Sequence, residues 1–169
     1  MAKQNLFKYL LAKKSEVRDL KLKDVLLAKT VIDIHRHKTG SSMCYVPLSS
    51  LTSIHAIDRE NARRSLQKRI VQLRQHKADC LQRGDLSKEY MLSLLPSVSG
   101  IKVVQVGNDW VAFEGNGRME AFKAVFRNGD AIRLQVEVYQ VDAPQKIARR
   151  VRRVQRHNQL ITKSFSGTR

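Results

Sequence analysis

In the stretch Trp110–Ala121, WVAFEGNGRMEA, a strand-like run gives way to two glycines and then to a helical pattern. The run WVAFE, residues 110–114, has the apolar and aromatic composition typical of strands. Met119, Phe122 and Phe126 share one helical face, which predicts a helix over residues 119–126. The two glycines between these segments predict a tight strand-to-helix turn.

The turn Glu114-Gly115-Asn116-Gly117-Arg118 indicates a phosphate or nucleotide site. The first N–H groups of a helix have no partner inside it, and the helix dipole attracts anions there. Asn116 tolerates a left-handed conformation and can donate from its amide, and Arg118 can direct two parallel hydrogen bonds at a phosphate. Glu114 is placed to hold a metal ion, to orient Arg118 or to act as a catalytic base. A purely structural turn, with Glu114 paired to Arg118, explains the same residues.

Strand signals flank this turn on both sides. Residues 101–106 and 110–114, joined by Gly107-Asn108-Asp109, predict a β-hairpin with Gly107 and Asn108 at positive φ. Residues 132–141 alternate between apolar and polar side chains and predict a further strand.

The first fifty residues predict a helix and two strands. Leucines and Val17 recur at helical spacing over residues 3–28, and residues 30–34, TVIDI, predict a short strand. We expect a polar loop over residues 35–42 and a strand over residues 44–48, at a sheet edge because it contains Pro47.

Two helices are predicted before the hairpin and one after the last strand. Asp58 is the predicted N-cap of a long basic helix that Gly84 ends, and a short helix follows from Asp85 to near Pro96. Asp142 is expected to cap the C-terminal helix, with Pro144 in its first turn. The predicted division is an N-terminal segment 1–42, a core 43–142 with a helical insertion 58–95, and a basic C-terminal helix and tail 143–169.

Charge is the strongest compositional signal. Among 169 residues, 32 Lys and Arg oppose 15 Asp and Glu, giving a formal net charge of +17. The segment from Lys146 to the end contains no acidic residue. Such a field attracts polyanions, of which nucleic acid is the commonest. Two cysteines and no apolar run near ~20 residues argue against a disulfide scaffold and a membrane-spanning helix, and the cytoplasm is the expected compartment.

The C-terminal helix is the predicted nucleic-acid surface. Ile147, Val151, Val154 and Ile161 form a narrow apolar seam, and basic residues cover the other faces. The predicted contacts are Lys146, Arg149, Arg150, Arg152, Arg153 and Arg156, joined by Arg63, Arg64, Lys68 and Arg69 of the long helix. An anionic membrane surface, an acidic protein partner and a merely solvated helix face are the alternatives. The sequence leaves the oligomeric state open, a homodimer included.

Several segments together resemble the ParB/sulfiredoxin-like superfamily over roughly residues 43–160. Gly115, Arg118 and Ala121 take the positions of its Gly-x-x-Arg motif and of the small residue that follows on the helix. The further matching segments are YVPLSSL at 45–51, LPSVSGI at 95–101, the strand at 132–141 and VQRHNQL at 154–160. The Fic family shares the Gly-Asn-Gly-Arg string but is excluded, because Trp110 and Ala121 replace its catalytic His and closing Arg.

The resemblance implies an α+β fold, with a small mixed sheet of four or five strands packed by helices. It also implies a nucleoside triphosphate ligand, with Mg²⁺, at the glycine turn, in a protein of plasmid, phage or chromosome maintenance or regulation. A small kinase, phosphotransferase or nuclease using Glu114 and Arg118 is the alternative.

Departures from the family pattern limit what carries over. Asn116 and Gly117 stand where sulfiredoxin needs its cysteine, which argues against sulfinic-acid reduction, and Gly117 replaces a second ParB arginine. Arg152 and Arg153 replace the Glu-Asn pair that opens the third ParB motif, which argues against metal-assisted nucleotide hydrolysis. A helix-turn-helix domain, which partition proteins carry, is not expected within these residues.

Overall fold

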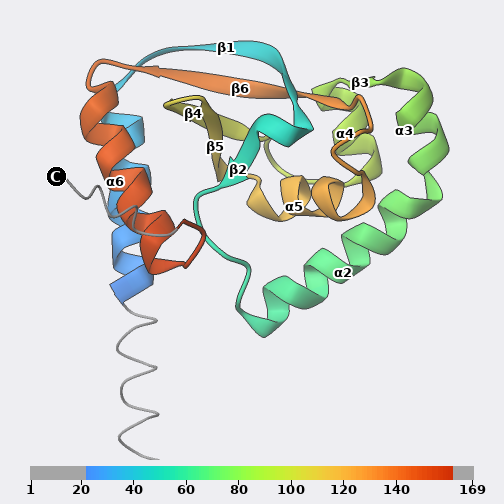
Figure 1. The fold of residues 1–169 in the computed structure, drawn as a ribbon, viewed down its shortest axis with the longest axis horizontal. Coiled ribbons are helices and arrows are strands. Elements are labelled where there is room, and N and C mark those ends of the chain that lie inside the picture. Colours follow the sequence, from blue (N-terminus) through green and yellow to red (C-terminus); the bar gives the residue numbers. More distant parts are fainter. Residues whose placement is uncertain (1–21, 162–169) are drawn as a thin grey trace, which may run out of the picture.

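The fold is taken from a computed structural model that describes residues 22–161. Its centre is a mixed six-stranded sheet (Figure 1). Five strands follow the order β1-β6-β4-β5-β2, and the sixth strand, β3, also pairs with β6. The strands are β1 Lys38–Pro47, β2 Leu51–Ser53, β3 Asp85–Leu86, β4 Lys102–Val106, β5 Asp109–Glu114 and β6 Arg133–Val141. β1 with β6 and β4 with β5 are antiparallel, whereas β4 with β6, β2 with β5 and β3 with β6 are parallel.

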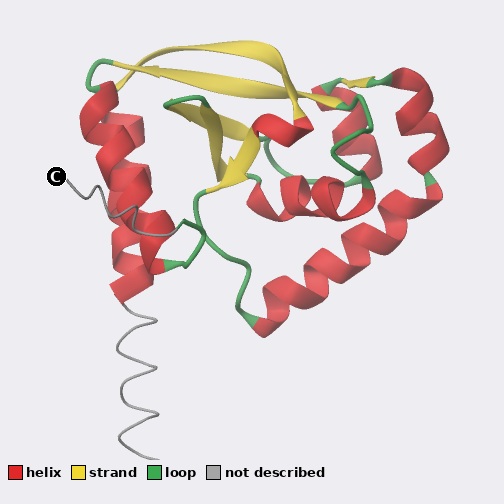
Figure 2. Cartoon of the chain, in the orientation of Figure 1, coloured by secondary structure: helices red, strands yellow, loops and turns green. Residues whose placement is uncertain are grey.

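Helices cover both faces of this sheet (Figure 2). They are an N-terminal helix over residues 22–36, a short 3₁₀ turn η1 Leu48–Ser50, α2 Glu60–Gln75, α3 Lys77–Arg83, α4 Lys88–Leu94, α5 Asn116–Val125 and α6 Pro144–His157. The N-terminal helix and α6 lie side by side at one end of the molecule, and α2 to α5 occupy the other (Figure 1).

Two hydrophobic cores follow from the alternation of side chains along the strands. Ala112 points into the larger core, formed with α2 to α5, whereas its neighbours Val111 and Phe113 point into the smaller one. The smaller core is closed by Ile147, Val151 and Val154 of α6 and by Ile34 of the N-terminal helix. α6 therefore docks through the predicted seam, except that it ends at His157 and does not include Ile161.

The hairpin, the last strand and the edge strand are confirmed. β4 and β5 pair through the turn at Gly107, whose φ is +66°, but Asn108 is not at positive φ. β6 covers nearly all of the predicted residues 132–141, and β1 lies at one edge of the sheet.

The predicted strand over residues 30–34 is wrong, because these residues continue the N-terminal helix. Their β-branched composition favours a strand, but Thr30, Asp33 and Ile34 are buried at helical spacing, so packing of one helix face against the sheet overrides local propensity. The predicted loop over residues 35–42 is also wrong in part, because β1 begins at Lys38. The predicted helix over residues 3–28 lies mostly outside the described residues.

Both predicted aspartate caps are wrong. Arg59 is the N-cap of α2 and Ala143 that of α6, and neither cap makes a side-chain hydrogen bond. Asp142 instead pairs with His37 Nδ1 at 2.6 Å. The predicted long helix is interrupted at His76 and ends at Gly84, which adopts φ +67°. The short helix that was expected from Asp85 begins at Lys88, because Asp85 and Leu86 form β3.

The architecture is consistent with the predicted α+β class. Between β2 and β4 the chain forms α2, α3, β3 and α4, which take the place of the predicted insertion over residues 58–95. The predicted boundary between residues 42 and 43 falls within β1, where both residues pair with β6.

Candidate phosphate site and basic surface

Gly115 makes the turn from β5 into α5 possible. It is the N-cap of α5 with φ +82°, a left-handed conformation in which a side chain is strained. A Cβ atom there would also lie 3.0 Å from Arg118 Nη2 and 3.0 Å from Ile101 Cγ1. The Gly115 carbonyl accepts hydrogen bonds from the N–H groups of Arg118 and Met119. The left-handed position predicted for Asn116 is thus taken by Gly115, and Asn116 begins the helix.

Asn116 is a buried amide without a hydrogen-bonding partner. It is only 5% exposed, and neither its Oδ1 nor its Nδ2 has a partner among the described residues. Leaving a buried polar group unpaired costs about 1–3 kcal/mol. Native proteins pair nearly all such groups, so this amide, like the buried Thr52 Oγ1, needs a partner that the described residues do not supply, such as a water or a ligand.

Arg118 lies folded against the turn. The residue is 5% exposed, and its Nη2 donates to the Gly100 carbonyl over 3.1 Å. Burial lowers the pKa of Arg118, the positive charge of Arg69 lowers it further, and the negative charge of Glu114 partly opposes them. Within residues 22–161 Arg118 forms no ion pair, so the structural alternative in which Glu114 and Arg118 pair with each other is not what the side chains do.

Glu114 is held by other partners at the end of β5. Its Oε2 lies 2.7 Å from Lys102 Nζ, and its Oε1 accepts a hydrogen bond from Ser99 Oγ over 2.5 Å. Burial alone would raise the pKa of Glu114, but the hydrogen bonds from Lys102 and Ser99 outweigh it and bring the pKa below its ordinary value. The carboxylate is therefore ionised at neutral pH and a weak base.

Arg69 of α2 reaches this turn, which the sequence did not predict. A Cβ atom on Gly117 would lie 2.5 Å from Arg69 Nη1, so the guanidinium rests directly on Gly117. The sequence assigned Arg69 to the nucleic-acid surface because it lies among other basic residues. No local pattern links it to Gly117, which is far along the chain.

The basic residues of α6 divide into two sets. Lys146 Nζ lies 2.9 Å from His37 Nε2, and Arg150 pairs with the buried Asp33 of the N-terminal helix. Arg149, Arg152, Arg153 and Arg156 have no ion-pair partner in the described part of the chain. We call these four residues the α6 arginine cluster.

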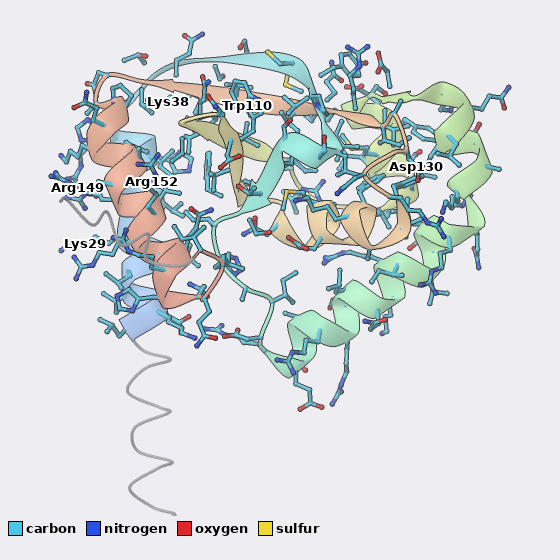
Figure 3. All side chains as sticks on the ribbon, viewed as in Figure 1. Lys29, Lys38, Trp110, Asp130, Arg149 and Arg152 are labelled. Atoms are coloured by element: carbon cyan, nitrogen blue, oxygen red, sulfur yellow. The ribbon has the colours of Figure 1, made fainter. Side chains whose placement is uncertain are left out.

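Two hollows border the α6 arginine cluster. One, of about 550 Å³, lies between α6 and the hairpin turn and is lined by Arg149, Arg152 and Arg156. The other, of about 580 Å³, lies between α6 and the N-terminal helix, where Lys29 adds a further cation. Figure 3 shows Arg149 and Arg152 on α6 and Lys29 on the N-terminal helix at the same end of the molecule.

The basic residues of α2 lie elsewhere. From its start near the end of α6, α2 runs toward the opposite end of the molecule (Figure 1). Arg63 and Lys68 are exposed, and Arg64 pairs with Glu60 on the same helix. The structure thus carries Lys68 away from the α6 arginine cluster, whereas Arg63 and Arg64 lie in the first turns of α2, at its end nearer α6.

Metal-binding groups do not converge in the described residues, which hold no cluster of three or more His, Cys, Asp or Glu side chains suited to a metal ion. Asp33 and His37 have the partners given above, and His35 packs its ring against Phe113 and Tyr139.

No helix in residues 22–161 is long and apolar enough to cross a membrane. Neither a protein family, nor a curated protein, nor a solved structure matches this chain.

Proposed function

We propose that this chain is a ParB/sulfiredoxin-like protein that binds a nucleotide phosphate at the start of α5 and nucleic acid along α6. The observation that carries the first part is the unpaired, buried amide of Asn116 in the first turn of α5, beside a buried Arg118 without a carboxylate partner. An anion there would receive N–H groups, the amide and positive charge together. The mixed sheet and the central hairpin are consistent with the superfamily resemblance.

Calorimetry with CTP, ATP and ADP, with and without Mg²⁺, tests the nucleotide site. We expect wild type to bind at least one of them and Asn116→Asp to bind at least tenfold more weakly, because the new carboxylate repels phosphate. Asn128→Asp, the same change in an exposed turn, is the matched control and should bind normally. Failure of wild type to bind any of the three would contradict the proposal. The described residues offer no metal cluster, so Mg²⁺ would be held largely by the nucleotide phosphates.

The α6 arginine cluster carries the nucleic-acid part of the proposal. Its four cations lie on an exposed helix face, beside two hollows and without acidic partners in residues 22–161. Phosphate contacts of this kind position a protein on nucleic acid without reading bases. We expect binding of duplex DNA that is weakly sequence-selective and that weakens steeply with salt. A role in plasmid, phage or chromosome maintenance, in a reducing cytoplasm, fits such a protein, and both cysteines are free thiols.

The salt dependence of binding tests this surface. Replacing Arg149, Arg152, Arg153 and Arg156 by Ala should lower the slope of log affinity against log salt by about 0.9 for each lost phosphate contact. Replacing Arg63, Arg64, Lys68 and Arg74 of α2 removes the same charge and should change the slope less. Equal slopes for wild type and the α6 variant would exclude the α6 surface, and binding to anionic vesicles alone would assign the charge to a membrane.

A second candidate function is a nucleotide-dependent phosphotransferase or nuclease. It is favoured by the ionised Glu114 beside Lys102, next to the proposed phosphate site. Turnover that Glu114→Gln abolishes while nucleotide binding survives would establish it. Binding without turnover in wild type would leave a binding protein.

A further inference from the structure

Gly117 occupies a position where the backbone does not require glycine. It is the second residue of α5 and is not at positive φ, so alanine would suit the helix better by about 0.5–1 kcal/mol. The atoms nearest to an added Cβ all belong to one side chain, with Arg69 Nη1 at 2.5 Å and Arg69 Cζ at 3.6 Å. The missing side chain leaves room for a guanidinium at the start of α5.

The packing of α2 against α5 brings Arg69 to this place. Its neighbours Ile70 and Leu73 are buried in the same core as Met119 and Phe122 of α5, so the two helices pack against each other. Arg69 itself is half-buried and has no ion-pair partner in the described residues. The helical insertion brings it to the turn, and Gly117 leaves room for its guanidinium there.

Two guanidinium groups therefore approach the same helix N-terminus. The charge of Arg69 is close enough to Arg118 to lower its pKa. Like charges brought together at a partly buried site repel each other, and the positive end of the α5 dipole adds to the repulsion. No carboxylate among the described residues forms an ion pair with either group, and only the charge of Glu114 acts on Arg118 from nearby. An external anion would balance the positive charge that remains.

We infer that Arg69 is a phosphate ligand of the α5 site, placed there by Gly117, and that the site takes a nucleoside di- or triphosphate in preference to a nucleoside or monophosphate. This inference rests on the proposed nucleotide site and extends it to α2. The N–H groups of Asn116 and Gly117 and the Asn116 amide satisfy one phosphate group. Arg69, which reaches the turn from a second helix, adds a charge that a chain of phosphates can meet and a neutral nucleoside cannot.

Calorimetry with ADP, ATP and CTP, and with the corresponding monophosphates and nucleosides, tests the inference. Arg69→Ala should weaken di- and triphosphate binding by about 10- to 100-fold, the effect of losing a hydrogen bond to a charged group. Lys68→Ala, the same loss of charge at the adjacent exposed position, should bind as wild type does. Duplex DNA affinity of Arg69→Ala should stay close to that of Lys68→Ala.

Gly117→Ala separates a ligand from a bystander. It keeps both arginines but displaces the Arg69 guanidinium, so we expect the same loss of affinity with an unchanged or raised melting temperature. The double variant should bind no more weakly than Arg69→Ala, because both changes remove one contact.

The possible outcomes distinguish the two proposals. Failure of wild type to bind any phosphate ligand would overturn the nucleotide site itself. If wild type binds and Arg69→Ala binds equally well, the role of Arg69 would be overturned and the nucleotide site would stand. Additive losses in the double variant would overturn the role of Gly117 in placing it.

Discussion

Arg150 shows how one residue can look like a ligand contact in the sequence and be an internal ion pair in the fold. It pairs with Asp33, which is only 5% exposed and whose other cation, Arg36, is 3.9 Å away. Replacing Arg150 by Ala leaves a buried carboxylate poorly paired, so we expect the free energy of unfolding to fall by about 1–3 kcal/mol. Urea denaturation measures this, and the neighbouring exposed Arg149→Ala should change stability by no more than about 0.5 kcal/mol. Equal effects would show that the pair contributes nothing.

The pair Glu114–Lys102 makes stability depend on pH in a definite direction. The pKa of Glu114 is below its ordinary value of 4.5, so its contribution is present above that pH and is lost as the pH falls through the folded-state pKa. Hydrogen bonding to Glu114 raises the pKa of Lys102, so the lysine's contribution is lost only as the pH rises through that raised value. Thermal melts from neutral to acidic pH should show a steeper loss in wild type than in Glu114→Gln. Parallel curves would contradict the assignment.

Among the elements, α6 has a double role, since it closes the smaller core and presents the arginine cluster. Ile147 is 1% exposed against the sheet, whereas Ile32 on the N-terminal helix is 56% exposed. Ile147→Ala should therefore cost about 2–5 kcal/mol, and Ile32→Ala, the same change on an exposed face, within about 0.5 kcal/mol. Urea denaturation of both variants checks this. A small loss in Ile147→Ala would mean that α6 is not docked as described.

Elements with strong local signals were predictable from the sequence, and those fixed by distant packing were not. Gly107, the alternation along β6 and Pro144 each act within a few residues, so the hairpin, the last strand and the place of Pro144 in the first turn of α6 were predicted correctly. Residues 30–34 have strand composition, and only the burial of Thr30 and Ile34 against the sheet shows why they are helical. A better signal was present, because these buried positions continue the helical spacing of Leu27.

The candidate site was predictable only where it is one segment. Gly115 to Arg118 are consecutive, so their turn could be proposed from the sequence, although Gly115 rather than Asn116 takes the left-handed conformation. Arg69 against Gly117 and Arg150 against Asp33 join residues from helices far apart in the chain. Charge composition alone cannot separate a cation that faces solvent from one that has a partner, so it placed all of them on one surface.

At the scale of the whole molecule, the net charge of +17 should make stability depend on ionic strength. Self-repulsion destabilises a compact, highly charged chain, and salt screens it, since the Debye length falls from about 30 Å at about 0.01 M to about 8 Å at about 0.15 M. We expect the melting temperature of wild type to rise over this range. The rise should be smaller in the variant that lacks the α6 arginine cluster than in the α2 variant of equal charge. The reason is local: the cluster has no carboxylate among the described residues of α6, whereas Glu60 pairs with Arg64 on α2. A melting temperature that falls with salt, or a rise that is reduced equally in the two variants, would show that the repulsion is not concentrated at α6. The positive field at α6 is also the one that would attract the phosphates of a nucleic acid.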